Sequence, residues 1–155
     1  MDLTILGVGR LRPAYRGACD DYLRRLGRYA KVAEVEVREA SRAPTVTVQQ
    51  QEEAARLAER MPDGATVIAL AREGSAWTSE ELARRMEGWR MAARPLVFVL
   101  GGSRGLSPTF LTTASVRWSL GPLTLPHELA RVVVAEQLYR AFTILRGEPY
   151  HKGRP

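Results

Sequence analysis

The sequence contains few of the residues on which disulfides and metal sites depend. Cys19 is the only cysteine in 155 residues, so neither an intrachain disulfide nor a cysteine-based metal site can form. The only histidines, His127 and His151, do not lie at ligand spacing from a cysteine or a carboxylate. We therefore predict no metal, and we expect Cys19 to be a small buried residue on a helix.

Long hydrophobic runs and the common nucleotide motifs are also missing. No apolar stretch approaches the roughly 20 residues of a membrane-spanning helix, and the first residues lack the basic start of a signal peptide. The sequence therefore predicts a cytosolic protein without a membrane partner. The patterns G-x-G-x-x-G and G-x-x-x-x-G-K-[ST] do not occur. This argues against a dinucleotide fold and a P-loop.

Lysine is scarce, whereas arginine is abundant. Lys31 and Lys152 are the only lysines among 23 basic residues, and the formal net charge is +6. A basic protein favours a nucleic-acid partner because its cations neutralise phosphates, although a genomic bias toward arginine codons has the same effect. The helix expected from Pro13 carries four arginines on one face, which is either a phosphate-binding surface or an ordinary solvated face: Arg16, Arg24, Arg25 and Arg28.

The hydrophobic pattern predicts strands that alternate with helices in a single domain over residues 1–155. Strands are expected at Asp2–Val8, Val32–Val37, Ala65–Ala71, Pro95–Leu100 and Val116–Leu120. Helices are expected from Pro13, over Gln50–Met61, from Thr78 or Ser79 to Ala93, from Ser107 or Pro108, and from His127. Residues 41–48 are predicted to form a loop and Arg72–Gly74 a turn. This order is typical of an α/β fold with a mostly parallel sheet and helices on both faces.

Three loops follow buried strands, after Leu70, Leu100 and Leu120. Ligands of parallel sheets bind outside the carboxyl ends of the strands, which is where these loops begin. The loop after Leu100 reads GGSRG, and by itself it indicates only a tight strand-to-helix turn. The loop after Leu120 reads GPLTLP and is mostly apolar. Together, the two loops can hold a flat aromatic base between backbone groups and aliphatic walls.

Three segments carry a resemblance to a known family: FVLGGSRGLSP, WSLGPLTLPHELARVVVAEQLYRAF and RGEPYHK. They resemble the small bacterial methyltransferases of the SPOUT superfamily. The best match is the subgroup that methylates N3 of a pseudouridine in 23S (large-subunit) ribosomal RNA, and it covers essentially the whole chain. The resemblance implies a deep C-terminal trefoil knot, S-adenosyl-L-methionine as methyl donor, a homodimer, and rRNA in the assembled ribosome as substrate.

The resemblance also implies a set of site residues. The cofactor would be bound by Leu70, Gly101, Gly102, Gly121, Pro122, Leu123, Thr124, Leu125 and Pro126. The catalytic, substrate-facing side would comprise His127, Arg131, Tyr150 and His151, with the tail reaching toward the neighbouring subunit. Departures from the family pattern are Ser103-Arg104 in the glycine loop and the extension 153–155 after Lys152.

The expected chemistry leaves the role of each polar residue open. N3 of pseudouridine is a poor nucleophile until its proton leaves, so a base or an anion-stabilising group should matter. His127, His151 and bulk water are all candidates for accepting that proton. Arg131 is a candidate for stabilising the developing negative charge or for holding a phosphate.

Two other functions compete with the methyltransferase. The basic charge alone would permit a non-catalytic RNA-binding or ribosome-assembly protein, and the α/β pattern would permit a plain nucleotide-binding domain. The apolar loop 121–126 favours the enzyme, because a protein that binds only RNA needs no cofactor slot. The missing phosphate motifs count against the nucleotide-binding domain.

Overall fold

The computed structural model describes residues 1–152 of the chain. Ten elements alternate: β1 (Asp2–Val8), α1 (Pro13–Leu26), β2 (Lys31–Val37), α2 (Val46–Glu59), β3 (Thr66–Ala76), α3 (Ser79–Ala92), β4 (Leu96–Leu100), α4 (Pro108–Thr113), β5 (Val116–Ser119) and α5 (His127–Leu145). The strands form one parallel sheet in the order β2-β1-β4-β3-β5, so the predicted α/β fold is confirmed. None of the described helices is long and apolar enough to span a bilayer.

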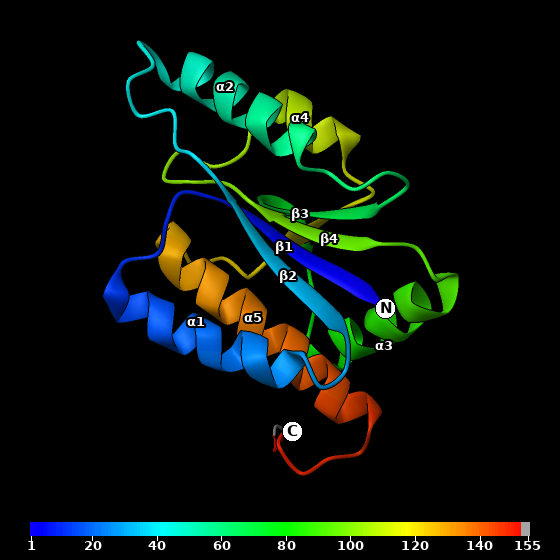
Figure 1. The fold of residues 1–155 in the computed structure, drawn as a ribbon. Helices are drawn as coiled ribbons and strands as arrows, with labels where there is room; N and C mark the ends of the chain where they lie inside the picture. Colours follow the sequence, from blue (N-terminus) through cyan, green and yellow to red (C-terminus); the bar gives the residue numbers. More distant parts are fainter. Residues whose placement is uncertain (153–155) are drawn as a thin grey trace.

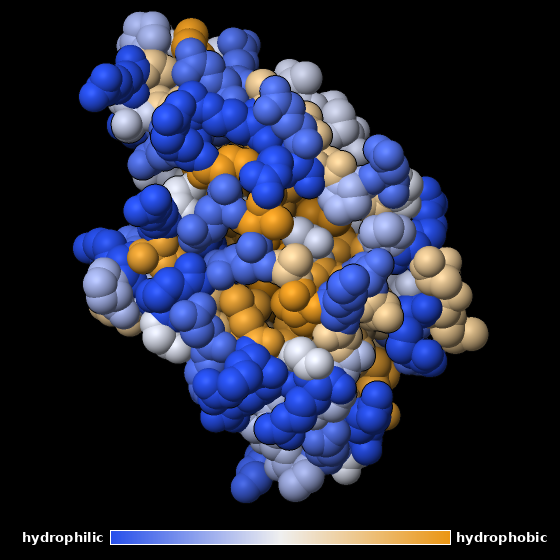
Figure 2. Space-filling view, viewed as in Figure 1, coloured by the Kyte–Doolittle hydropathy of each residue, from blue (hydrophilic) through white to orange (hydrophobic). Residues whose placement is uncertain are grey.

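Helices cover both faces of the sheet. Helices α1, α3 and α5 pack on one face, and α2 with α4 on the other (Figure 1). Side chains alternate between the faces along each strand: Ile5 and Phe98 join the cluster under α1, α3 and α5, and Leu6 and Val97 join the cluster under α2 and α4. In the space-filling view, hydrophobic residues gather between α2 and α1, and hydrophilic residues cover the outsides of these helices (Figure 2).

Strand β3 is longer than predicted, and the predicted turn at Arg72–Gly74 is wrong. The strand continues to Ala76 and pairs with β5 twice, because Leu70 and Ser75 both lie opposite Trp118. Gly74 passes so close to β5 that a Cβ there would lie 2.7 Å from the carbonyl carbon of Arg117. The polar residues after Leu70 therefore form an irregular stretch within a strand, where a side chain at position 74 has no room.

Most helix starts agree with the sequence, but α2 begins earlier than predicted. Pro13 and Pro108 stand at first helical positions, where a missing N–H costs nothing, and α5 begins at His127. Helix α2 begins at Val46, so the predicted loop over residues 41–48 is too long. Thr45 caps this helix by accepting a hydrogen bond from the Val48 N–H at 3.1 Å. The trefoil knot, which is a matter of how the chain threads, stays a prediction.

Candidate functional site

A pocket of about 900 Å³ lies at the carboxyl ends of β4 and β5, beside the irregular part of β3. Its walls are the residues of β3 from Leu70 to Arg72 and the loops after Leu100 and Leu120, so the three segments singled out in the sequence do meet. All the predicted cofactor residues except Pro122 line it: Leu70, Gly101, Gly102, Gly121, Leu123, Thr124, Leu125 and Pro126. Pro122 belongs to the same loop but does not contribute to the lining.

The glycine loop after β4 is a tight turn that leaves backbone exposed toward the pocket. The Gly105 N–H donates to the Gly102 carbonyl at 3.0 Å, and Gly105 has a φ of +73°. A Cβ on Gly101 would lie 2.4 Å from the carbonyl carbon of Gly105, so this position accepts only glycine unless the loop moves. The main-chain groups of Gly101, Gly102 and Gly105 form part of the pocket wall and can form hydrogen bonds with a ligand.

The loop after β5 supplies an apolar wall. Its first turn is held by Ser119, whose hydroxyl accepts from the Gly121 N–H at 3.1 Å. The side chain of Leu123 is 78% exposed, which is unusual for a leucine, and it lies at the pocket. Trp118, which also lines the pocket, is buried and stacks on Trp77 with ring centroids 5.4 Å apart. The apolar side chains of this loop form a surface suited to a flat apolar group.

Helix α5 begins at the pocket with His127. No hydrogen bond is recorded for the His127 side chain among residues 1–152, and the residue lines the pocket. The first N–H groups of a helix lack intrahelical partners and carry partial positive charge, so this end of α5 favours a ligand with negative charge.

Glu128, the next residue, faces away from the pocket toward the start of α1. Its carboxylate accepts hydrogen bonds from the Arg12 backbone N–H at 2.6 Å and from the Arg12 Nε at 2.7 Å. These bonds hold the pKa of Glu128 below its usual value of 4.5. The contact therefore fixes where α5 starts relative to α1.

The structure places Arg131 outside this pocket. Its side chain is 2% exposed, and its guanidinium pairs with Glu34 at 3.1 Å and with Glu36. It also donates to the backbone carbonyl of Gly9 at 3.0 Å. With these partners, Arg131 connects α5 to β1 and β2, and the substrate contact expected from the sequence has no support in this geometry.

Tyr150 in the C-terminal tail is packed against α5. Its hydroxyl donates to the Glu136 carboxylate at 2.7 Å, and its ring lies 4.7 Å from the Arg140 guanidinium. Burial, together with the bond to Glu136, raises the pKa of Tyr150 above its usual value.

His151 is held between α5 and α3. Its Nδ1 lies 3.0 Å from Arg140 Nη1, and its Nε2 lies 3.1 Å from the Glu80 carboxylate. Because a guanidinium can only donate, Nδ1 accepts that bond, and the ring proton sits on Nε2 facing Glu80. The tail is thus a packed element in the described chain, and both ring nitrogens of His151 are engaged.

The predicted catalytic residues do not all come together within one chain. His127 stands at the first residue of α5, whereas Tyr150 and His151 bond to Glu136 and Arg140, nine and thirteen residues further along the helix. At 1.5 Å per residue, these two partners lie about 14 and 20 Å along the helix axis from His127. The structure therefore joins the predicted cofactor residues to His127 and separates them from Arg131 and the tail. The extension 153–155 lies outside the described residues.

Several residues of these sites were not expected from the sequence. Arg72, Arg104 and Trp118 line the pocket, and Glu136, Arg140 and Glu80 hold the tail. The four-residue spacing of Glu136 and Arg140 on a helix was an available signal for their ion pair. Within residues 1–152, no group of three or more His, Cys, Asp or Glu side chains is arranged to hold a metal ion.

Comparisons with known proteins match nearly the whole chain to methyltransferases. A family model described as "Predicted SPOUT methyltransferase" matches residues 1–151. A Rubrobacter xylanophilus protein named "Ribosomal RNA large subunit methyltransferase H" is 52% identical over 96% of this chain and 96% of its own length. A protein of the same name from Anaeromyxobacter sp. (strain Fw109-5) is 45% identical over 98% of this chain and 100% of its own.

Among solved structures, a probable methylase family protein from Haemophilus influenzae Rd KW20 matches with a TM-score of 0.57. It covers 99% of this chain and 71% of that one at 15% identity, so the likeness supports the fold alone. The match to the family model and the identity to the curated relatives decide membership. The chain belongs to the SPOUT methyltransferase family.

Proposed function

We propose that this protein transfers a methyl group from S-adenosylmethionine to N3 of a pseudouridine in large-subunit ribosomal RNA, acting on the ribosome in the cytoplasm. The pocket between the irregular part of β3 and the carboxyl ends of β4 and β5 carries the proposal, because glycine backbone, an apolar wall and His127 all line it. The two relatives described above are named for methylation of large-subunit ribosomal RNA and span nearly the whole chain, which supports the same substrate.

The pocket has the chemistry that this cofactor requires. Its volume of about 900 Å³ is within the usual range for small-molecule sites. The apolar side chains of Leu70, Leu123 and Leu125 suit an adenine ring, and main-chain groups of the 101–105 loop suit its polar edge. When bound, the cofactor supplies a methyl group that its sulfonium already activates. The protein therefore mainly needs to align the two reactants and exclude water.

His127 is the histidine better placed to act on the substrate. It lies at the pocket without a recorded side-chain hydrogen bond in the described part of the chain, whereas the Nδ1 of His151 already accepts a bond from Arg140. The imide proton of N3 can pass to the free imidazole nitrogen of His127. The N-terminal N–H groups of α5 then favour the negative charge that remains on the base.

A homodimer would bring the tail of one subunit to the pocket and His127 of the other. Tyr150 and His151 bond to Glu136 and Arg140 of α5, away from the pocket of their own chain, so in a dimer they could contribute to the pocket of the other subunit. Leu129 and Val133 on α5 are also only partly buried in the single chain, which leaves apolar surface for a partner. We infer that the tail of each subunit completes the substrate side of the other subunit's pocket.

Two measurements test this proposal. Calorimetry with S-adenosylhomocysteine should give micromolar binding, and mapping of methylated nucleotides should show one pseudouridine modified by the wild-type protein. His127→Ala should keep the binding and reduce the rate of methyl transfer by roughly 100-fold, a typical contribution of a general base. No binding of S-adenosylhomocysteine would leave the non-catalytic RNA-binding protein as the better interpretation.

A further inference from the structure

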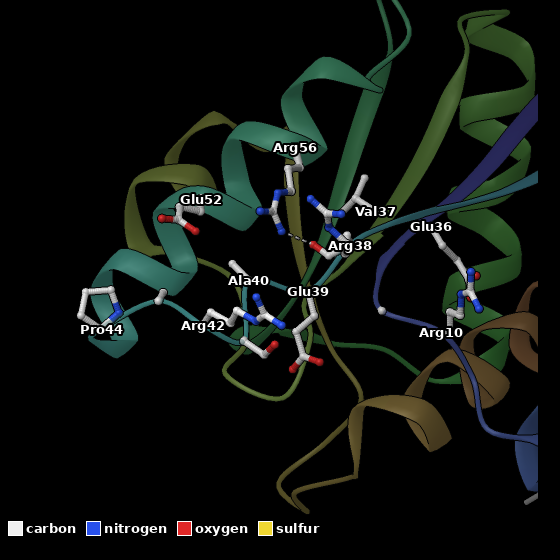
Figure 3. Close-up of a pocket in the computed structure, with 13 residues that line it drawn as sticks. Arg10, Glu36, Val37, Arg38, Glu39, Ala40, Arg42, Pro44, Glu52 and Arg56 are labelled. Carbon is white, nitrogen blue, oxygen red and sulfur yellow. Dashed lines mark hydrogen bonds between the residues drawn. The ribbon is translucent and has the colours of Figure 1, made fainter.

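A second hollow, of about 1010 Å³, lies at the carboxyl ends of β1 and β2. The β1–α1 turn, the segment 36–44 and helix α2 form its walls (Figure 3). It occupies the half of the sheet edge that the first pocket leaves free, since the strand order places β2 and β1 together at one side. None of the residues predicted from the sequence to bind cofactor or substrate lines it.

The hollow is rich in arginine. Its four guanidinium groups belong to Arg10, Arg38, Arg42 and Arg56. Of its three carboxylates, Glu36 pairs with Arg131, whereas Glu39 and Glu52 keep their negative charge. No ion pair between the four arginines and a carboxylate is recorded within residues 1–152. Four guanidinium groups against two such carboxylates leave the hollow with a net positive charge.

The arginines of α1 behave differently, although they were the phosphate surface considered from the sequence. Arg16 pairs with Glu34 at 2.5 Å and with Asp20 at 3.1 Å. Arg24 and Arg25 both pair with Asp21. Carboxylates thus offset most of the positive charge on that face, and the hollow is the better place for an anion.

The hollow adjoins the candidate cofactor pocket. The Ser103 hydroxyl donates to the Glu39 carboxylate at 3.2 Å, and the Gln50 amide donates to the Arg104 carbonyl at 2.8 Å. The glycine loop that lines the pocket is thereby attached to the wall of the hollow. A long ligand can occupy both, with one part in the pocket and the next in the hollow.

We propose that this hollow binds the sugar–phosphate backbone of the RNA beside the nucleotide that is methylated. Guanidinium groups bind phosphate through paired hydrogen bonds, and several unpaired ones in one hollow suit a polyanion. The few apolar residues present, such as Val37 and Pro44, offer little to an uncharged ligand. The inference rests on the proposed function, because it takes ribosomal RNA to be the substrate.

A triple variant tests the inference without disturbing the fold. Arg10→Gln, Arg38→Gln and Arg42→Gln change three exposed side chains that make no recorded hydrogen bond in the described chain. Arg56 is kept, because its Nη1 donates to the backbone carbonyl of Arg38 at 2.6 Å. The matched control changes exposed arginines away from this edge and lowers the net charge equally: Arg28→Gln, Arg60→Gln and Arg84→Gln.

The readout is binding to unmethylated 70S ribosomes in 50 to 200 mM KCl. The logarithm of the association constant falls linearly with the logarithm of the salt concentration, and each lost phosphate contact makes this slope less steep by about 0.7. Three lost contacts should therefore reduce the steepness by about 2 and weaken binding roughly 100-fold at 0.1 M salt. The control triple variant should stay within about threefold of wild type. Both should bind S-adenosylhomocysteine as wild type does, and the hollow variant should raise KM more than it lowers kcat.

The inference is overturned if the hollow variant binds ribosomes as wild type does, or if both triple variants weaken binding equally. It is also overturned if wild type binds inorganic pyrophosphate with micromolar affinity and the hollow variant loses this binding while its ribosome binding is unchanged. Because ribosome binding is measured without turnover, failure of this inference and failure of the proposed function give different results. An inactive wild-type protein whose ribosome binding still depends on Arg10, Arg38 and Arg42 would refute the methyltransferase and leave the RNA surface standing.

Discussion

The hydroxyl of Tyr150 donates a hydrogen bond to the carboxylate of Glu136 over 2.7 Å, and this bond attaches the tail to α5. Arg140 strengthens the attachment, because it pairs with the same carboxylate at 2.7 Å and also covers the Tyr150 ring. The C-terminal segment is therefore a packed element whose removal exposes parts of α5. Its distance from the pocket of its own chain makes its contribution to function testable.

Deleting residues 150–155 should leave binding of S-adenosylhomocysteine unchanged and abolish most methyl transfer to ribosomes. The pocket is built without the tail, so the loss should appear in turnover.

The matched variant Tyr150→Phe removes only the hydroxyl and should cost about 1 kcal/mol of unfolding free energy, the usual value of a hydrogen bond. Calorimetry, urea unfolding and a methylation assay measure these effects. Full activity after the deletion would contradict the role of the tail.

Gly101→Ala should weaken binding of S-adenosylhomocysteine at least tenfold. The new Cβ would lie 2.4 Å from the Gly105 carbonyl carbon, and because that atom is backbone, the loop itself has to move. Ser103→Ala, in the same loop, adds no atoms and should bind the ligand as wild type does. Calorimetry on both variants, with circular dichroism to confirm folding, checks the prediction. Equal affinities would remove the glycine loop from the cofactor site.

The sequence predicted the elements whose signals are local. Apolar runs marked β1 and β4, and prolines marked the starts of α1 and α4. It did not predict the end of β3, because that part of the strand depends on pairing between Ser75 and Trp118, far apart in the chain. It also missed the first turn of α2, because the polar segment 41–48 with Pro44 has the composition of a loop.

The candidate site was predictable to a similar extent. The loops that follow parallel strands lie at the same edge of the sheet, so the strand pattern predicts that Gly101 and Leu125 line one pocket. Their predicted role in binding the cofactor came from the family resemblance. The position of Arg131 could not be predicted. Its carboxylate partners, Glu34 and Glu36, are 97 and 95 residues away, and no local pattern connects them.

Glu128 should make the stability depend on acid pH. Its pKa is lowered from 4.5 in the folded state by the bond from the Arg12 N–H, so the carboxylate stabilises the fold above about pH 4.5. This contribution is lost as the pH falls through the folded-state pKa. Urea unfolding of wild type and Glu128→Gln should therefore differ by a constant amount from pH 7 to 5 and converge below that range. A difference that does not change with pH would contradict the assignment.

Substitutions of Arg131 distinguish a structural role from a catalytic one. Arg131→Met removes the buried cation between Glu34 and Glu36 and leaves them the partly exposed Arg16 as a cationic partner, which should cost about 3 kcal/mol of unfolding free energy. Arg131→Lys keeps the charge but cannot reach the Gly9 carbonyl and both carboxylates together, so we expect a smaller loss. Because neither change touches the pocket, both variants should keep a near wild-type kcat at temperatures where they are folded. Urea unfolding and methylation rates measured on the same samples check this. The opposite result would be an Arg131→Lys variant that is as stable as wild type yet transfers methyl groups at least 100-fold more slowly. In that case the guanidinium acts on the substrate, and it leaves its buried position in this chain during catalysis.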